Sequence, residues 1–329
     1  MEFGMITDSL SARDFDDVLR IAADLGLDSI EIPTGNWSEA PHVDLDELLE
    51  SSLARAEYRD RVAAHGLRIS ALNANGNQLH PVSGPAHDAI LRKTIRLAQL
   101  MEVPTVVCMS GLPAAAGDRT PNWVTSSWPP ENVTVLEYQW EQVAIPYWRE
   151  LAEFSAEHSV RLAIEPCFSQ LVYNVSTAQR LLHAIGRDSV GINLDPSHLM
   201  AMGADIPEVI RGLAGSIVHV HAKDARLNKP LVALNGLPDG TAMTLPRERA
   251  WNYVTLGLGH PAGGVVLGRV RVRAAGRRLR RNAEHRARRC AAELRRGSPS
   301  RRSATGQSRA ARNARLAARR SVGRGLSGA

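Results

Sequence analysis

The chain has 329 residues, of which 44% are hydrophobic and 22% charged, and its formal net charge is +6. This length suits two average domains, or one barrel of roughly 250 residues with an appendage. The sequence contains no run of about 18 apolar residues and does not begin with a secretory signal pattern, so a membrane span and export are not expected. Three cysteines (Cys108, Cys167 and Cys290) exclude a disulfide framework and a cysteine zinc site, and we expect a cytoplasmic protein.

The net charge is the average of two unlike segments. Residues 1–260 contain 20 Lys and Arg against 32 Asp and Glu, which gives −12. Residues 261–329 contain 20 arginines, no lysine and two acidic residues, which gives +18. We therefore expect an acidic globular domain over residues 1–260, followed by an Arg-rich tail whose low apolar content leaves it disordered.

Short β-branched runs alternate with longer amphipathic stretches along the acidic segment. The expected strands are Glu2–Thr7, Ser29–Ile32, Arg68–Asn73, Thr105–Met109, Arg161–Glu165, Val190–Leu194 and Ser216–His221. The expected helices are Ala12–Leu25, Leu45–His65, Ala86–Met101, Leu136–His158, Ser176–Ile185 and Ile206–Leu213. Seven such units predict parallel strands with helical crossovers. Because seven units exceed most open sheets and no Gly-x-Gly-x-x-Gly follows a strand, an α/β fold of the (β/α)8 TIM-barrel type is favoured, with its eighth unit missing or non-native.

Side chains that can bind metals follow three consecutive predicted strands. Glu165 ends the fifth strand, Asp195 and His198 follow the sixth, and His219 and His221 end the seventh. Chemistry in such barrels takes place at the C-terminal ends of the strands. Carboxylates mixed with imidazoles suit hard divalent cations, and the lack of cysteine argues against structural zinc. The two histidines of the seventh strand should point the same way, so one can bind a metal while the other orients it or contacts substrate.

Each of these residues also has an ordinary structural interpretation. Asp195 before Pro196 is a good helix N-cap, Glu165 can simply precede a loop, and inward histidines can be core residues. Their combination at the same end of three neighbouring strands favours a metal site over these alternatives.

The same residues carry a resemblance to a known family. Glu165, the Asp-x-x-His at 195–198 and the His-x-His-x-Lys-Asp at 219–224 resemble the xylose isomerase-like barrel family of sugar isomerases and epimerases. The segments at 4–10 and 28–33 are similar to that family as well. The resemblance covers residues 1 to 260.

The resemblance implies a metal centre and its ligands. It implies one divalent metal ion, Mn²⁺, Mg²⁺ or Co²⁺ rather than Zn²⁺, held by Glu165, Asp195, His221 and a second glutamate from strand eight. It implies a small-molecule sugar or sugar phosphate as substrate, and a homo-oligomer is compatible with it. The side chains expected to contact the substrate are His198, Arg226, Lys223 and His80.

The expected reaction is isomerisation or epimerisation. A metal that bridges two adjacent oxygens of a hydroxy-ketone stabilises the enediolate formed when a C–H proton is removed. Glu165 would be the catalytic base on one face of the substrate and the second glutamate the acid on the other. One alternative is an endonuclease-type phosphodiesterase barrel, which needs about three metals and more His and Glu ligands. The other is non-enzymatic nucleic-acid binding through the basic tail, which we expect to be only non-specific because the tail has no aromatic residue for stacking.

The tail departs from the family pattern, which would supply a helix, an eighth strand ending in Glu-His, and a closing helix. Arg-, Ala- and Gly-rich sequence is what GC-rich coding DNA gives out of frame. One permitted codon set for 278–288, read one base later, encodes Gly-Tyr-Asp-Gly-Thr-Leu-Ser-Ile-Glu-His, which includes the missing glutamate. We therefore hypothesise a one-base frameshift between Gly259 and Leu267, which would leave the chain as written with an impaired site.

Overall fold

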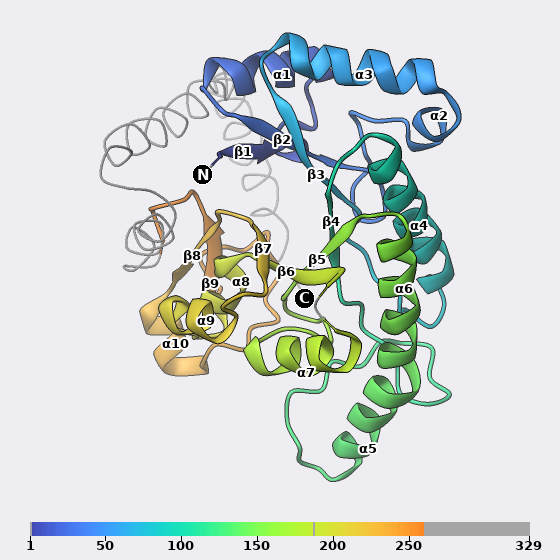
Figure 1. Cartoon of the computed structure of the whole chain (residues 1–329). Coiled ribbons are helices and arrows are strands. Elements are labelled where there is room, and N and C mark those ends of the chain that lie inside the picture. The colour runs from blue at the N-terminus through green and yellow to red at the C-terminus, as the bar shows by residue number, and fades with distance from the viewer. Residues whose placement is uncertain (1, 187, 260–329) are drawn as a thin grey trace, which may run out of the picture. The chain divides into compact units, whose positions relative to one another are not determined.

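The structure is a computed structural model, and it describes residues 2–186 and 188–259 (Figure 1). The predicted tail, its frameshift and the strand-eight glutamate lie outside the described residues. Within the described ranges, no helix is both long and apolar enough to cross a bilayer.

Seven parallel strands form one curved sheet in which each strand pairs with the next along the chain (Figure 1). The strands are β1 Gly4–Ile6, β2 Ser29–Pro33, β3 Arg68–Asn73, β4 Thr105–Met109, β5 Arg161–Glu165, β6 Val190–Leu194 and β7 Ile217–Val220. Four of the seven have the predicted bounds, and the other three differ at their ends. This order confirms a curled half-barrel of the (β/α)8 type, of which an eighth unit is not among the described residues.

Helices alternate with the strands along the chain. They are η1 Thr7–Leu10, α1 Phe15–Asp24, α2 Leu45–Glu50, α3 Ser52–Ala64, α4 Gly84–Leu100, α5 Glu131–Glu137, η2 Tyr138–Ala144, α6 Ile145–Glu157, α7 Val175–Ile185, α8 Pro196–Ala201, α9 Ile206–Gly212 and α10 Lys229–Asn235. The short η1 is a 3-10 helix, and η2 is a π-helical segment between α5 and α6.

Two predicted helices need correction. The single helix expected over Leu45–His65 is wrong, because the chain leaves helical geometry at Ser51 (φ −104°, ψ 115°). The Ser51 hydroxyl accepts a hydrogen bond from the backbone N–H of Ala54 and so caps the start of α3. The helix expected over Leu136–His158 begins earlier, at Glu131, and is π-helical in its middle part.

A two-stranded antiparallel sheet, which the sequence analysis did not predict, follows β7. It pairs β8 (Asp224–Leu227) with β9 (Trp251–Val254). The Asp224 carboxylate accepts hydrogen bonds from the backbone N–H groups of Gly257 and Gly259, which fixes the chain just after β9. The pairing brings the hydroxyl of Tyr253 to 2.7 Å from Nδ1 of His198, a predicted site residue.

Strand β5 shows how the core and the site are divided. Leu162 and Ile164 are fully buried in the main hydrophobic core with side chains from the helices. Ala163 belongs instead to a small separate cluster with Ala71 and Val107 from β3 and β4. Because successive side chains of a strand point to opposite faces, Glu165 lies on the same face as Ala163, inside the curve of the sheet.

Candidate metal site inside the barrel

Polar side chains from four strands meet inside the curved sheet at its C-terminal edge. Glu31 is on β2 and Glu165 is the last residue of β5, while Asn193 is on β6. His219 is on β7 and His221 follows it directly. Their contacts span up to 190 residues of sequence, since His221 reaches Glu31. The curvature of the sheet therefore builds the site.

The three predicted metal ligands converge. Glu165, Asp195 and His221 each offer one ligand atom, and these atoms all lie within 4.8 Å of one another. The Nδ1 atom of His221 is 3.0 Å from Oε2 of Glu165. Asn193 supports this pair because its amide donates to the same Glu165 oxygen at 2.9 Å.

Asp195 caps a helix with one carboxylate oxygen and turns the other toward the predicted metal ligands. Its Oδ1 caps α8 by accepting from the backbone N–H of Ser197 at 2.9 Å and from the Ser197 hydroxyl at 2.6 Å. Its Oδ2 faces the site, 3.3 Å from Nε2 of His198 and 3.6 Å from the ammonium group of Lys223. The helix cap thus orients Oδ2 toward the other predicted metal ligands.

His198 and Lys223, two of the four predicted substrate residues, lie beside the predicted metal ligands. His198 Nε2 is 3.0 Å from Oε1 of Glu165, and its Nδ1 is 2.7 Å from the hydroxyl of Tyr253. Lys223 lies over the ring of the same tyrosine, 3.8 Å from the ring centroid. Tyr253 is therefore a site residue that sequence analysis missed, and β9 positions it.

The contacts of the other two predicted substrate residues lead away from the carboxylates. Arg226 donates from Nε to the backbone oxygen of Leu258 at 3.2 Å and lines a cavity of about 700 Å³ beside β8 and β9. His80 Nδ1 accepts hydrogen bonds from the backbone N–H groups of Val82 and Ser83, at 3.0 and 3.1 Å, just before α4. A role for Arg226 or His80 in substrate binding stays a prediction.

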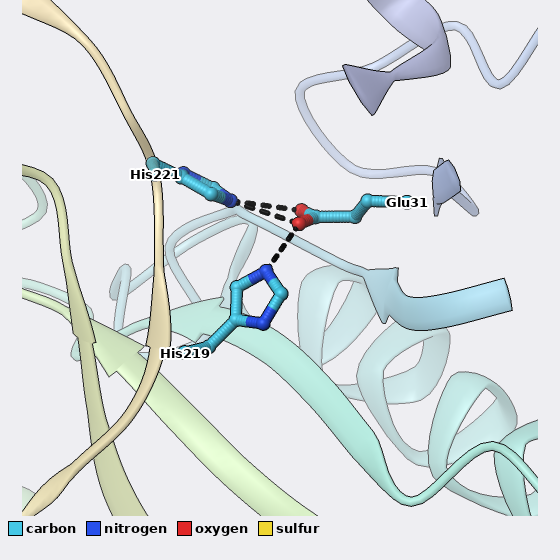
Figure 2. Close-up of side chains that lie close together, drawn as sticks. All are labelled: Glu31, His219 and His221. Carbon is cyan, nitrogen blue, oxygen red and sulfur yellow. Dashed lines mark hydrogen bonds and ion pairs between the residues drawn. The ribbon is translucent and has the colours of Figure 1, made fainter. Parts of the chain in front are cut away.

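Glu31 is the main residue that the sequence analysis did not select (Figure 2). The residue is 4% exposed, and its Oε2 lies 2.8 Å from Nε2 of His219 and 2.9 Å from Nε2 of His221. The Asn73 amide donates to its Oε1 at 2.7 Å. The available signal was a single acidic residue within the otherwise uncharged strand Ser29–Pro33, which is buried along its whole length.

Both buried glutamates are held ionised by the histidines around them. Burial alone would raise the pKa of Glu31, but the charge of His221 and the hydrogen bond from His219 outweigh it and lower this pKa to about 2. Burial would also raise the pKa of Glu165. The charge of His221 and the hydrogen bond from His198 outweigh that effect and lower it.

The same interactions raise the pKa values of His221 and His198. Burial would lower the pKa of His221, but the charges of Glu31 and Glu165 outweigh it and raise this pKa well above the ordinary 6.5. For His198, burial is outweighed by hydrogen bonds to Cys167 and Glu165, and the pKa rises to about 10. These raised pKa values favour a proton on His221 and on His198 at neutral pH when no cation is bound.

The donor set fits a divalent cation. Two carboxylates and an imidazole are ligands for Mg²⁺, Mn²⁺ and related ions, and a cation would replace the proton on Nδ1 of His221. The side-chain oxygens of Asn75 and Asn193 point to the same conclusion, because both are buried without a hydrogen-bond partner within the part of the chain that the structure describes. Such buried orphan oxygens are expected where an ion or a polar ligand completes the site.

A curled parallel sheet with carboxylates and imidazoles at its C-terminal edge defines a barrel protein with a metal-capable site. The chain belongs to the xylose isomerase-like TIM barrel family, whose model matches residues 19–260. The uncharacterized protein YfiH of Bacillus subtilis (strain 168) is 47% identical to it over 264 residues, which is 79% of this chain and 84% of that protein.

Solved structures support the same fold. The probable 3-DHS dehydratase AsbF from Bacillus anthracis matches with a TM-score of 0.60 and 16% identity, over 90% of this chain and 99% of that one. A D-tagatose 3-epimerase-like protein matches with a TM-score of 0.56 and 15% identity, over 90% and 96%. A xylose isomerase-like TIM barrel protein from Mycobacterium smegmatis in complex with magnesium matches with 0.54 and 16%, over 83% and 86%. At these identities the likeness is one of fold.

Proposed function

We propose that the chain has the scaffold of a divalent-metal-dependent isomerase or epimerase of a sugar or sugar phosphate, acting through an enediolate. The observation that carries the proposal is the convergence of Glu165, Asp195 and His221 within 4.8 Å at the C-terminal edge of the barrel sheet. The family membership and the epimerase-like neighbour support the same class of reaction. Mn²⁺, Mg²⁺ and Co²⁺ are the ions that we expect there.

The chain's own residues suit the proton transfer. A bound divalent cation would supply Lewis-acid stabilisation of the enediolate. Glu165, whose pKa is lowered, is a carboxylate at neutral pH and can accept the proton from the carbon next to the carbonyl. His198 holds the other oxygen of Glu165 at 3.0 Å and so fixes the direction in which the base points.

We propose that activity is impaired in the chain as written. The family arrangement calls for a glutamate from strand eight as fourth ligand and as the acid on the opposite face. The only glutamates after residue 260 are Glu284 and Glu293, within the Arg-rich tail. A frameshift that converts the strand-eight sequence into this tail would remove both the ligand and the acid.

The phosphodiesterase alternative is less well supported. The described residues provide two groups of three metal-capable side chains, and these groups share His221. A site with about three metals would need more independent ligands than this arrangement offers.

Proton exchange at the carbon next to the carbonyl tests the proposal. The full chain, loaded with Mn²⁺ in D₂O, is incubated with a panel of ketoses and ketose phosphates, and deuterium incorporation is followed by NMR. We expect slow, metal-dependent exchange that Glu165→Gln lowers by about 10²-fold or more. A chain with the frame restored to include Ser-Ile-Glu-His should exchange faster. The proposal would be refuted if exchange continued undiminished in Glu165→Gln. It would also be refuted if the metal-loaded, frame-restored chain showed no exchange.

A further inference from the structure

A second group of metal-capable side chains meets at Nε2 of His221 (Figure 2). Glu31, His219 and His221 offer three ligand atoms that lie within 4.8 Å of one another. Two imidazoles and one carboxylate form the protein ligand set of many zinc sites that keep an open coordination position. We propose that these residues form a second divalent-cation site, selective for zinc-like ions, that competes with the first site for His221.

The geometry is that of a built site. Both oxygens of Glu31 face Nε2 of His221, at 2.9 and 3.0 Å, and one of them faces Nε2 of His219 at 2.8 Å. The hydrogen bond from Asn73 to Glu31 orients the carboxylate in the way that outer groups orient metal ligands. Both histidine side chains are 19% exposed, which leaves a path for an ion, while Glu31 is buried.

The two nitrogens of His221 face different carboxylates. Nδ1 lies 3.0 Å from Glu165, and Nε2 lies 2.9 Å from Glu31. A neutral imidazole has one nitrogen with a lone pair and one that carries a proton. A cation at the first site takes the Nδ1 lone pair and leaves the Nε2–H to donate to Glu31. A cation at the second site takes the Nε2 lone pair and leaves the Nδ1–H to donate to Glu165.

Either arrangement satisfies the ring without rotating it, and both sites draw on this one imidazole. The two sites therefore exclude each other, a conclusion that rests on the first site of the proposed function. Their donor sets differ as well. Two carboxylates and one imidazole suit a hard ion, whereas two imidazoles and one carboxylate suit Zn²⁺. Excess zinc would thus draw His221 away from the first site and inhibit the enzyme.

Zinc binding to the full chain tests the second site on its own, by equilibrium dialysis with Zn²⁺ alone. Asp195→Asn weakens the first site and keeps His221, and an asparagine can still cap α8. We expect one tightly bound zinc in this variant, and about a 10²-fold weaker affinity when His219→Gln is added. Adding His183→Gln instead, at an exposed position on α7, should change nothing. Glu165→Gln provides a second way to disable the first site if the Asp195 variant is poorly folded by circular dichroism.

Three results would overturn the proposal. Absence of zinc binding to both first-site variants, or equal affinity with and without His219→Gln, would remove the second site. Two bound zinc ions per wild-type chain, both sensitive to His221→Gln, would show that the sites fill together and do not exclude each other. None of these results depends on catalysis, so a failure here and a failure of the proposed isomerase activity can be told apart.

Discussion

Replacement of Glu31 by glutamine removes one negative charge from the interior without changing the volume of the side chain. In the metal-free protein, the carboxylate accepts hydrogen bonds from His219, His221 and Asn73. A glutamine offers one acceptor oxygen, and its amide N–H groups face the N–H group of a histidine. The variant therefore leaves the His221 imidazolium without one of its two counter-charges.

The pKa of Glu31 falls from the ordinary 4.5 to about 2, and about 1.4 kcal/mol per pKa unit gives about 3 kcal/mol of stability at pH 7. Removal of one partner of a buried ion pair typically costs roughly 3–5 kcal/mol. We expect Glu31→Gln to lower the free energy of unfolding by about 3 kcal/mol at pH 7.

The pH dependence identifies the cause. Because the folded-state pKa is depressed, the stabilisation is complete above pH 4.5 and is lost as the pH falls toward 2. The difference in free energy of unfolding between wild type and variant should therefore shrink by more than half between pH 7 and about pH 3. Urea unfolding in the presence of a chelator measures this difference. Glu57→Gln, at an exposed position of α3, is the matched control. A gap below about 0.5 kcal/mol at pH 7, or one that persists in acid, would refute the reasoning.

The apparent Mn²⁺ affinity should strengthen as the pH rises from 6 to 8, by about tenfold per pH unit for one displaced proton. The reason is that the metal must replace a proton on His221, whose pKa is raised. Affinities that calorimetry finds to be independent of pH would contradict this prediction. Tyr253→Phe should cost about 1 kcal/mol, since it deletes the 2.7 Å hydrogen bond to His198, and an unchanged denaturation midpoint would count against that bond. Trp148→Ala should lower the free energy of unfolding by roughly 3–5 kcal/mol, because the indole is fully buried and also donates a hydrogen bond to the backbone oxygen of Ser110. Thermal unfolding measures this loss. A loss below about 1 kcal/mol would mean that the surrounding side chains collapse into the cavity.

The sequence was sufficient to predict most of the sheet. Strands such as Thr105–Met109 and Arg161–Glu165 are short apolar runs between helical patterns, and their bounds agree with the structure. The helices were less predictable at their ends. Ser51 ends one helix and caps the next, so an amphipathic pattern that continues across it gave no sign of the break.

Site residues were predictable from the sequence only where they stand at the end of a predicted strand or just after it. Glu165, Asp195 and His221 were found because each stands at the C-terminal end of a strand or just after one. Glu31 was not, because its role depends on histidines 188 and 190 residues away. No local pattern encodes a contact across the inside of a barrel. Tyr253 was missed for the same reason, since its place depends on the pairing of β8 with β9.

The contact between Glu31 and His221 also governs when the site can form. The two residues are 190 positions apart, so the second strand must wait for the seventh to emerge from the ribosome before its carboxylate meets an imidazole. Closing such a long loop makes the step slow compared with the local strand–helix units. Until then, Glu31 and Glu165 lack the charge of His221. The residues of the candidate metal site are therefore assembled late in synthesis, and a cation that needs His221 can bind only after β7 has formed.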